Sequence, residues 1–404
     1  MKYISNSVKT GFVAALAAMT ILSSCNKDLE QFPAATTTDP TGQALGEKIA
    51  ATPTDSLYYR LIVKAGMTAT LNTRSTYYTM FVPDNAAMRP FLTAASGGLV
   101  PLGSPDAAYS AFITNNFPAA SAVGVVSYNT SPQVITTASI PATFPNFQYP
   151  SILNPAPSLS ALLRLSVFPT TRNGNWVNNI PLTSTNSSVA NGVIHHTAAV
   201  NAPPSQYLWD RINTDAGLTY LKAAIIRADS GTGTPGTLQS ALLNIGANLT
   251  VFAPTDAVMQ GTLTALITQA LIAQGVPPAT AAAQAAVLAS TPGVFTNAAL
   301  FGTLTATTVK GIVVYHILGT RAFTNNFHTT RTNVPTLLNG GVPTHPGVGL
   351  QATFTAGQVS AASVKGLMNA SAANVILNPL PNGSSDQHYL NGVLHKIDQL
   401  LLPQ

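Results

Sequence analysis

Residues 250–259 read TVFAPTDAVM and residues 79–88 read TMFVPDNAAM, so one pattern occurs twice in the chain. In both places a short apolar run is followed by Pro. Next comes Asp84 or Thr255, whose side-chain oxygen can accept the free backbone N–H groups of a first helical turn. The pattern predicts a strand that leads into a capped helix. We therefore expect two copies of one structural unit.

A second motif is also repeated: Asn191–His195 reads NGVIH and Asn391–His395 reads NGVLH. The interval between the two motifs is longer in the later copy, so the copies carry unequal insertions. Asn-Gly favours the positive φ angles of a type I′ turn, and the residues after it read as the outgoing strand of a hairpin. We place copy one at residues 53–204 and copy two at residues 205–404.

The composition indicates a weakly charged globular protein that is exported. Only 8% of the residues are charged, where a soluble protein usually carries roughly 25%. The apolar run Gly11–Leu22 is too short for a spanning helix, which needs ~20 residues. Thr262–Ser290 is broken by Pro277-Pro278 and reads as two Ala-rich helices. The basic side chains are not clustered, which argues against nucleic acid as a partner.

The beginning of the chain has the pattern of an export signal. A positively charged start precedes the apolar run, and small residues precede Cys25. The sequence LSSC at Leu22–Cys25 resembles the bacterial lipobox, in which the signal is cut before the Cys and the Cys is acylated. We predict a lipoprotein signal peptide at residues 1–24 and lipidation at Cys25; the alternative is an ordinary signal peptide. Cys25 is the only Cys, so the mature chain would have no disulfide.

Residues 25–52 are predicted to form a flexible stalk, because they are rich in Thr, Pro and Ala and lack apolar periodicity. Asp28 and Glu30 resemble the signal by which Bacteroidetes lipoproteins are moved to the outer face. The expected location is therefore the outer membrane, with the chain held by its lipid anchor at the cell surface, or facing the periplasm.

Three linked motifs resemble the fasciclin adhesion domain. Residues 250–259, the sequence VVYHIL at Val313–Leu318 and the sequence NGVLHKID at Asn391–Asp398 are similar to its first conserved block, its Tyr-His motif and its second conserved block, in that order. The resemblance implies an α+β fold with two tandem fasciclin-like domains, each a twisted β-wedge flanked by helices. It also implies an extracellular protein or polysaccharide as the ligand, without a cofactor or a catalytic centre.

The Tyr-His motif differs between the copies. Copy two has Tyr315-His316, whereas copy one has Tyr128-Asn129 and lacks the imidazole. The family associates adhesion partly with this region, so we expect copy two to carry more of any adhesion. Together with the two strand histidines, these residues form the candidate adhesion or structural site: Tyr315, His316, Tyr128, Asn129, His195 and His395.

The sequence offers no catalytic or metal motif. A Gly-x-Ser-x-Gly elbow is absent, and no glutamate follows Glu47. Residues 231–236 match a dinucleotide fingerprint as letters, but Pro235 stands where the phosphate-binding turn should enter its helix, so we expect a loop. His395 alternates with apolar residues of its strand and is predicted to be a hydrogen-bonded core residue. His316, inside an apolar run, is also expected to be buried. We predict no enzyme activity, no cofactor and no metal site.

Two functional classes remain. The first is a surface-anchored lipoprotein that mediates cell adhesion or binds extracellular matrix or glycan. The alternative is an accessory ligand-binding component of an outer-membrane glycan or peptide uptake system, in which a Tyr, Trp176 or Trp209 would stack on the ligand. The long Thr- and Asn-rich insertions are a further place where binding specificity is expected.

Overall fold

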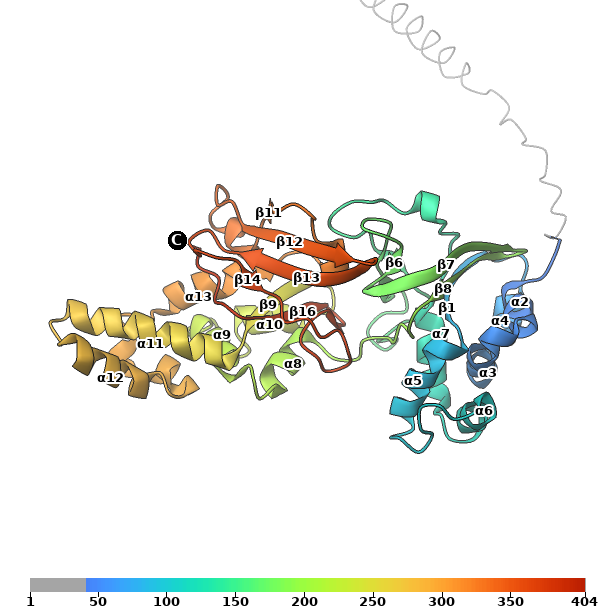
Figure 1. The fold of residues 1–404 in the computed structure, drawn as a ribbon, viewed down its shortest axis with the longest axis horizontal. Coiled ribbons are helices and arrows are strands. Elements are labelled where there is room, and N and C mark those ends of the chain that lie inside the picture. The colour runs from blue at the N-terminus through green and yellow to red at the C-terminus, as the bar shows by residue number, and fades with distance from the viewer. Residues whose placement is uncertain (1–40, 404) are drawn as a thin grey trace, which may run out of the picture. The chain divides into compact units, whose positions relative to one another are not determined.

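The structure is a computed structural model, and it describes residues 41–403. The predicted signal peptide, the lipidation site Cys25 and most of the predicted stalk lie outside the described residues. Within residues 41–403, none of the helices has both the length and the apolar character needed to cross a membrane. Figure 1 shows the order of the helices and strands.

The end of the predicted stalk is a helix. Residues Leu45–Ala51 form α2, and both Leu45 and Ile49 are fully buried in the core of copy one. These two residues are four positions apart, so they lie on one helix face. The stalk prediction is therefore wrong for this part, because one apolar pair is enough to pack so short a helix. Copy one begins before residue 53.

Copy one is built around two parallel strands. Strand β1 (Tyr78–Pro83) pairs in parallel with β8 (Gly192–Thr197), and the sheet order is β2-β1-β8-β7-β6-β5. Figure 1 shows the helices of this copy gathered on one side of these strands. The other strands are β2 (Thr130–Ser131), β3 (Tyr149–Pro150), β4 (Ser166–Val167), β5 (Pro169–Thr170), β6 (Trp176–Val177) and β7 (Ile180–Val189). The helices are α3 (Ser56–Lys64), α4 (Thr68–Asn72), α5 (Asn85–Ala95), α6 (Asp106–Asn115) and α7 (Ala119–Tyr128).

Copy two repeats this arrangement and adds a four-stranded sheet, whereas the second sheet of copy one is the two-stranded pair β3–β4. Strand β9 (Leu249–Pro254) pairs in parallel with β16 (Gly392–Ile397) in the order β10-β9-β16-β15. The added sheet has the order β11-β12-β13-β14. Its strands and the flanking ones are β10 (Ile317–Leu318), β11 (Thr332–Val334), β12 (Val348–Thr355), β13 (Gln358–Lys365), β14 (Ala373–Asn374) and β15 (Gln387–Tyr389).

The helices of copy two include a long antiparallel pair, α11 and α12, which has no counterpart of that length in copy one (Figure 1). The helices are α8 (Leu208–Thr214), α9 (Thr219–Ala228), α10 (Thr237–Leu243), α11 (Asp256–Ala273), α12 (Pro278–Leu288) and α13 (Ala306–Tyr315). Short 3-10 helices are η2 (Pro53–Asp55), η3 (Thr137–Ser139), η4 (Pro292–Thr296), η5 (Ala298–Leu300), η6 (Thr324–Asn326) and η7 (Leu337–Gly340). Helices and mixed sheets together confirm the α+β class.

The predicted capping of the helices after β1 and β9 is half right. Asp84 accepts the backbone N–H of Ala87 at 2.8 Å, as expected. Thr255 makes no such bond. Its neighbour Asp256 instead accepts the backbone N–H of Tyr220 at 3.0 Å and so fixes the start of α9. Thr255 is the N-cap residue of α11, but its side chain makes no capping bond, so the Thr255 prediction is wrong.

The Asn-Gly motif does not form the predicted type I′ turn. Strand β7 ends at Val189 and β8 begins at Gly192, so the turn residues are Ala190 and Asn191, and neither has a positive φ. Gly192 has φ +151°, and a Cβ on it would lie 1.8 Å from the carbonyl oxygen of Tyr78. Glycine is required here because two strand backbones approach closely.

Asn191 connects three segments of copy one. Its side chain is fully buried; Oδ1 accepts the N–H of Leu45 at 2.8 Å, and Nδ2 donates to the carbonyls of Leu71 at 2.8 Å and Thr73 at 3.0 Å. Its own carbonyl accepts the N–H of Tyr78 at 3.0 Å. One residue thus joins the first helix, the end of α4 and the central strand.

Asn391 does the same in copy two. Its Oδ1 accepts the N–H of Leu208 at 3.0 Å and its Nδ2 donates to the carbonyl of Leu242 at 2.8 Å. Its carbonyl accepts the N–H of Leu249 at 3.0 Å. A Cβ on Gly392 would lie 2.4 Å from the carbonyl oxygen of Leu249. Asn191 and Asn391 therefore join corresponding segments in the two copies.

We expect Asn191→Ala to lower the free energy of unfolding by about 2–4 kcal/mol, because buried donors and acceptors left unpaired cost about 1–3 kcal/mol each. The groups that lose their partner are the N–H of Leu45 and the carbonyls of Leu71 and Thr73. Urea unfolding followed by circular dichroism measures the change.

Asn391→Ala should cause a similar loss in copy two. The matched control is Asn115→Ala, an exposed position near the end of α6, which should change stability by less than about 0.5 kcal/mol. If the two buried variants were as stable as this control, the side chains of Asn191 and Asn391 would not stabilise their own copies.

Candidate functional site

The side chain of His316, in the Tyr-His motif, is buried and bonds two different segments of the chain. It is the C-cap of α13 and only 2% exposed. Its Nδ1 lies 2.8 Å from the carbonyl oxygen of Ile312, and its Nε2 accepts the N–H of Leu401 at 2.9 Å. Nδ1 therefore carries the proton. Burial lowers the pKa of His316 to about 4, so the ring is neutral near pH 7. The burial predicted for His316 is confirmed.

Asn129 makes the equivalent pair of hydrogen bonds in copy one. It is the C-cap of α7, and its Nδ2 donates to the carbonyls of Val125 and Asn201, both at 2.8 Å. The first carbonyl lies one helical turn earlier, as Ile312 does for His316. The second belongs to the segment that ends copy one. The amide therefore takes over the structural role of the imidazole.

The two tyrosines of the motif hold the insertions. Tyr315 donates its hydroxyl to the carbonyl of Gly347 at 2.8 Å and accepts the N–H of Leu367 at 2.9 Å. Tyr128 donates to the carbonyl of Ser166 at 3.1 Å. Both rings are fully buried, and burial raises the pKa of both hydroxyls. In copy two, Gly347 and Leu367 lie at the two ends of the β12–β13 hairpin, so Tyr315 fixes its base.

His395 is a hydrogen-bonded core residue, as predicted. Its ring stacks on Phe252 with the centroids 5.8 Å apart, its Nε2 lies 2.9 Å from the carbonyl oxygen of Ala322, and its Nδ1 accepts the N–H of Asp386 at 3.1 Å. Burial lowers its pKa, although Asp386 acts in the opposite direction. His195 is also fully buried and stacks on Phe81 at 5.6 Å.

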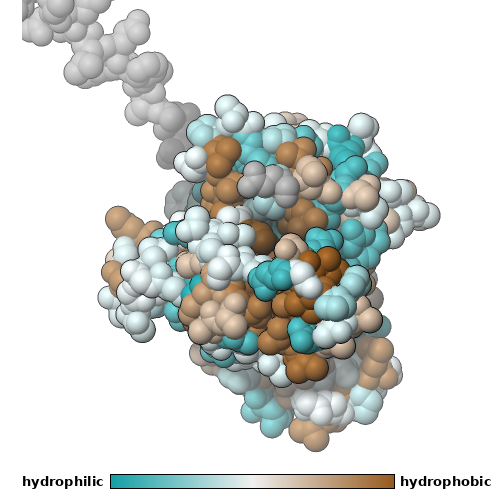
Figure 2. All heavy atoms as spheres, turned by 90° about the vertical axis from the view of Figure 1, so that its left-hand side faces the viewer, coloured by the Kyte–Doolittle hydropathy of each residue, from teal (hydrophilic) through white to brown (hydrophobic). Residues whose placement is uncertain are grey.

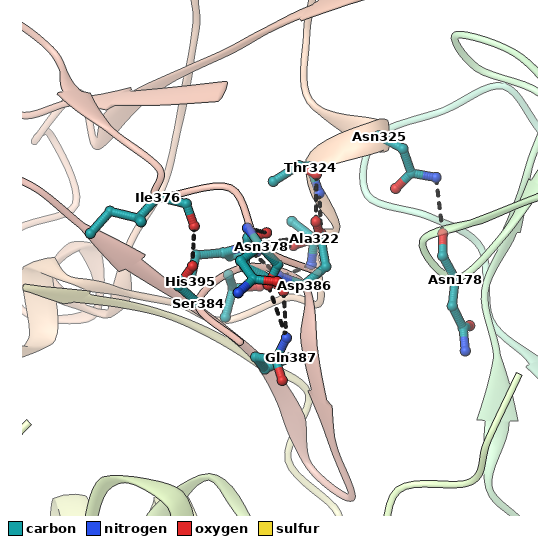
Figure 3. A network of polar contacts seen from close by, with 12 residues as sticks. Asn178, Ala322, Thr324, Asn325, Ile376, Asn378, Ser384, Asp386, Gln387 and His395 are labelled. Carbon is teal, nitrogen blue, oxygen red and sulfur yellow. Dashed lines mark hydrogen bonds and ion pairs between the residues drawn. The ribbon is translucent and has the colours of Figure 1, made fainter. Parts of the chain in front are cut away.

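A polar network surrounds His395 (Figure 3). Asp386 accepts the N–H of Thr324 at 2.7 Å and its hydroxyl at 2.6 Å. In copy one, Asn186 accepts the N–H of Thr137 at 2.9 Å and donates its Nδ2 to the hydroxyl of Thr137 at 2.6 Å. Asn186 and Asp386 both have positive φ angles, +59° and +53°. The two copies are thus alike down to single side-chain bonds.

The segments that the motif residues position also join the two copies. Asn325 donates to the carbonyl of Asn178 at 2.9 Å (Figure 3), and the guanidinium of Arg172 lies 2.6 Å from Nδ1 of His328. Asn173 donates to the carbonyl of Phe327 at 3.0 Å. These contacts link the β5–β6 region of copy one to the segment after β10 of copy two.

Arg321 is the residue at this junction that the sequence analysis missed. It is 5% exposed, its guanidinium lies 4.7 Å from the ring centre of Phe168, and its Nε donates to Oδ1 of Asn248 at 2.8 Å. It also bonds the ring of His388, which lies on β15. Burial lowers its pKa to about 10. Copy one has the exposed Val134 at this position, and comparing the copies would have revealed the difference.

His196, next to His195 but on the opposite face of β8, belongs to a Ser-His-Asp arrangement. Its Nδ1 lies 2.8 Å from Oγ of Ser184 and its Nε2 lies 3.0 Å from Oδ2 of Asp55. Lys396 takes its place in copy two and pairs with Asp215 at 2.7 Å. Because a lysine fills the same place, we interpret the arrangement as an ion pair that joins the central strand to a helix.

The glycine-rich segment before α10 does not form a nucleotide site. The carboxylate of Asp229 accepts the N–H groups of Leu238 at 2.9 Å and Gln239 at 3.0 Å. It therefore occupies the helix N-terminus that a phosphate would need. Among residues 41–403, no three His, Cys, Asp or Glu side chains are grouped so that they could hold a metal ion.

The chain was compared with known families, curated proteins and solved structures. No family model matches the sequence. None of the curated proteins matches it either. Among solved structures, a FAS1 domain pair from the insect cell adhesion molecule fasciclin I matches. It shares 14% sequence identity over 85% of this chain and 95% of that chain, with a TM-score of 0.33. At this TM-score the match does not by itself establish a common fold.

We expect His316→Asn to lower the free energy of unfolding near pH 7 by about 1–3 kcal/mol, because the smaller amide leaves space and reaches Leu401 poorly. The loss should shrink as the pH falls. An unfolded histidine has a pKa of ~6.5, so keeping His316 neutral stabilises the fold fully above that value and progressively less down to about 4. Urea unfolding at about pH 7 and about pH 5 measures both terms. If the difference in the free energy of unfolding between wild type and His316→Asn stayed constant with pH, the interpretation of His316 as a buried neutral ring would be wrong.

His196→Gln should have the opposite pH dependence. The hydrogen bond to Asp55 raises the pKa of His196. The stabilisation is therefore complete below the unfolded value of ~6.5 and is lost as the pH rises through the raised folded value. The expected loss is about 1 kcal/mol near pH 6 and smaller near pH 8. Lys396→Gln is the matched control in copy two, because a lysine ammonium stays charged in this range. Equal pH profiles for the two variants would rule out the His196 pair.

Proposed function

We propose that the chain is a surface-anchored, non-catalytic adhesion lipoprotein with two fasciclin-like domains. The first occupies residues 53–204 together with α2, and the second occupies residues 205–404. The observation that carries this proposal is the pairing of the motifs. In both copies the strand of the first block lies parallel to the strand of the second block, with Phe81 opposite His195 and Phe252 opposite His395.

The ligand of this proposal is an extracellular protein or polysaccharide, bound through surfaces that the motif residues support. His316 and Tyr315 are buried and fully hydrogen-bonded, so neither ring is free to touch a partner. They act by holding the C-terminal segment and the base of the β12–β13 hairpin. The strands of that hairpin carry exposed residues toward its tip, in the range 353–361. We infer that such supported insertions carry the adhesive contacts.

The alternative, an accessory component of an uptake system, loses its main sequence argument. Trp176 is 3% exposed and Trp209 is 7% exposed, so neither ring can stack on a ligand. The predicted stacking role is therefore wrong for both. Each Trp lies at the start of a short strand or helix, where packing needs account for it.

The proposed anchor is the lipid at Cys25. Two or more acyl chains hold a protein stably in a membrane, whereas one chain gives only marginal binding.

Cells that display the wild-type chain should be retained in a flow cell coated with collagen, fibronectin or the cells' own polysaccharide. Cells that express Cys25→Ser should lose retention and should not incorporate a palmitate analogue into the chain. Retention no higher than that of cells lacking the chain, on all three coatings, would refute adhesion. Palmitate labelling of Cys25→Ser equal to wild type would refute the anchor alone. A melting curve of Cys25→Ser serves as the control for folding.

A further inference from the structure

The two copies meet at a junction of interlocking apolar side chains. Phe144 of copy one packs on a core cluster of copy two, and Leu390 of copy two packs on a core cluster of copy one. Between them, Phe168 and Phe323 pack with their ring centres 6.1 Å apart, next to Val393. Each copy also has a larger core among its own helices. Figure 2, which looks from the side of α11 and α12, shows the end of copy two that faces away from the junction. The junction can therefore open without exposing the main core of either copy.

Two arginine–histidine contacts lie at this junction. The guanidinium of Arg172 in copy one lies 2.6 Å from Nδ1 of His328 in copy two. The guanidinium of Arg321 bonds Nε2 of His388. A guanidinium has only donors, so the ring nitrogen that faces it must be an unprotonated acceptor. Both imidazoles are therefore neutral while the junction is closed.

His388 lies between the copies and is packed among aromatic rings. The ring centres of Phe168 and Tyr128, both in copy one, lie 6.2 Å and 6.3 Å from its own, and that of Phe323 lies 5.4 Å away. Its Nδ1 lies 3.4 Å from the hydroxyl of Tyr128, and the charged group that faces it is Arg321. Protonation of His388 would place a second cation beside Arg321, against the rings of copy one.

His328 has similar surroundings at the other contact. Its ring centre lies 5.1 Å from that of Phe144 in copy one, and the charged group that faces it is Arg172. The next charged residue along the chain, Arg331, is also a cation and bonds Oε1 of Gln351 at 3.0 Å. His328 is partly exposed, so a proton from water can reach it. Its protonation would set two cations against each other across the junction.

No carboxylate is placed to neutralise these protons. Among residues 41–403, the histidines that pair with a carboxylate are His196 and His395. Asp386, two residues before His388, faces His395. Burial and the charge of the neighbouring arginine lower the pKa of His328, and they hold the pKa of His388 well below its ordinary value.

We propose that the junction is an acid-sensitive switch, in which protonation of His328 and His388 separates the two copies while each copy keeps its fold. Residues 198–207, which connect the copies, contain no helix or strand, so the chain can bend there. The inference goes beyond adhesion, because it depends on neither the anchor nor a ligand.

The direction of the pH dependence follows from the contacts. In the separated copies both rings face water and take up protons at the ordinary value of ~6.5. The closed junction excludes these protons. Its stability is therefore complete above that value and is lost as the pH falls. Each proton taken up on opening raises the ratio of open to closed molecules by up to about tenfold per pH unit, so two histidines give up to about 100-fold.

Energy transfer between two dyes gives the test. Cys25 is the only Cys, so the full chain with Cys25→Ser, Asn115→Cys and Ala283→Cys carries one label on α6 of copy one and one on α12 of copy two. Both labelled positions are exposed. The pH is lowered in steps from about 7 until the far-UV circular dichroism is lost. We expect the transfer efficiency to change reversibly at a higher pH than the one at which the circular dichroism is lost.

Two variants keep the acceptor and remove the titration. His388→Gln places an amide oxygen near Nε2, and His328→Asn places one near Nδ1, so each can still accept from its arginine. Each should reduce the pH dependence to at most about tenfold per pH unit. The double variant should stay closed at the pH where wild type is half open. His328→Asn alone gives the test if His388→Gln does not fold. The matched control is His196→Gln, a titrating ring that bonds Asp55, which should leave the transition unchanged.

Three results would overturn the proposal. The first is a transfer efficiency that stays constant until the circular dichroism is lost. The second is a change of both signals at the same pH, which would mean that the copies unfold and do not separate. The third is a pH dependence of His328→Asn or of the double variant equal to that of wild type, which would assign the transition to other groups.

Discussion

The fold depends on the close approach of two parallel strands at a glycine. The carbonyl oxygen of Tyr78 lies where a Cβ of Gly192 would be, and that of Leu249 crowds Gly392 in the same way. The preceding Asn191 and Asn391 then bond the first helix of each copy and the segment before the central strand. At this contact the two strand motifs of each copy pair in a parallel register.

The two copies preserve bonding roles more strictly than residue types. The residue at the end of α7, Asn129, has an amide side chain, and the residue at the end of α13, His316, has an imidazole. Both side chains bond the carbonyl one helical turn earlier. The partner beyond the helix is a carbonyl for Asn129 and an N–H for His316. Each residue type suits its partner. An imidazole with its proton on Nδ1 can accept an N–H at Nε2, whereas the amide NH₂ of Asn129 donates to a carbonyl.

The sequence was sufficient to predict features that depend on local pattern. The repeat, the strand before each helix, the burial of His316 and the core position of His395 follow from spacing and alternation. The role of Asn191 was not predicted, because its partners Leu45 and Leu71 are distant in the chain. Helix α2 was missed because it has a single apolar pair. Arg321 was missed because it lies outside the repeated motifs, although an alignment of the two copies places Val134 opposite it.

Arg321 also makes the two copies unlike at their junction. Its guanidinium crosses from copy two to Phe168 of copy one, and its hydrogen-bond acceptors are uncharged. Copy one has Val134 at the position of Arg321, so it lacks the cation there. The position equivalent to Arg321 in copy one therefore cannot make the cation–π contact that links copy two to Phe168.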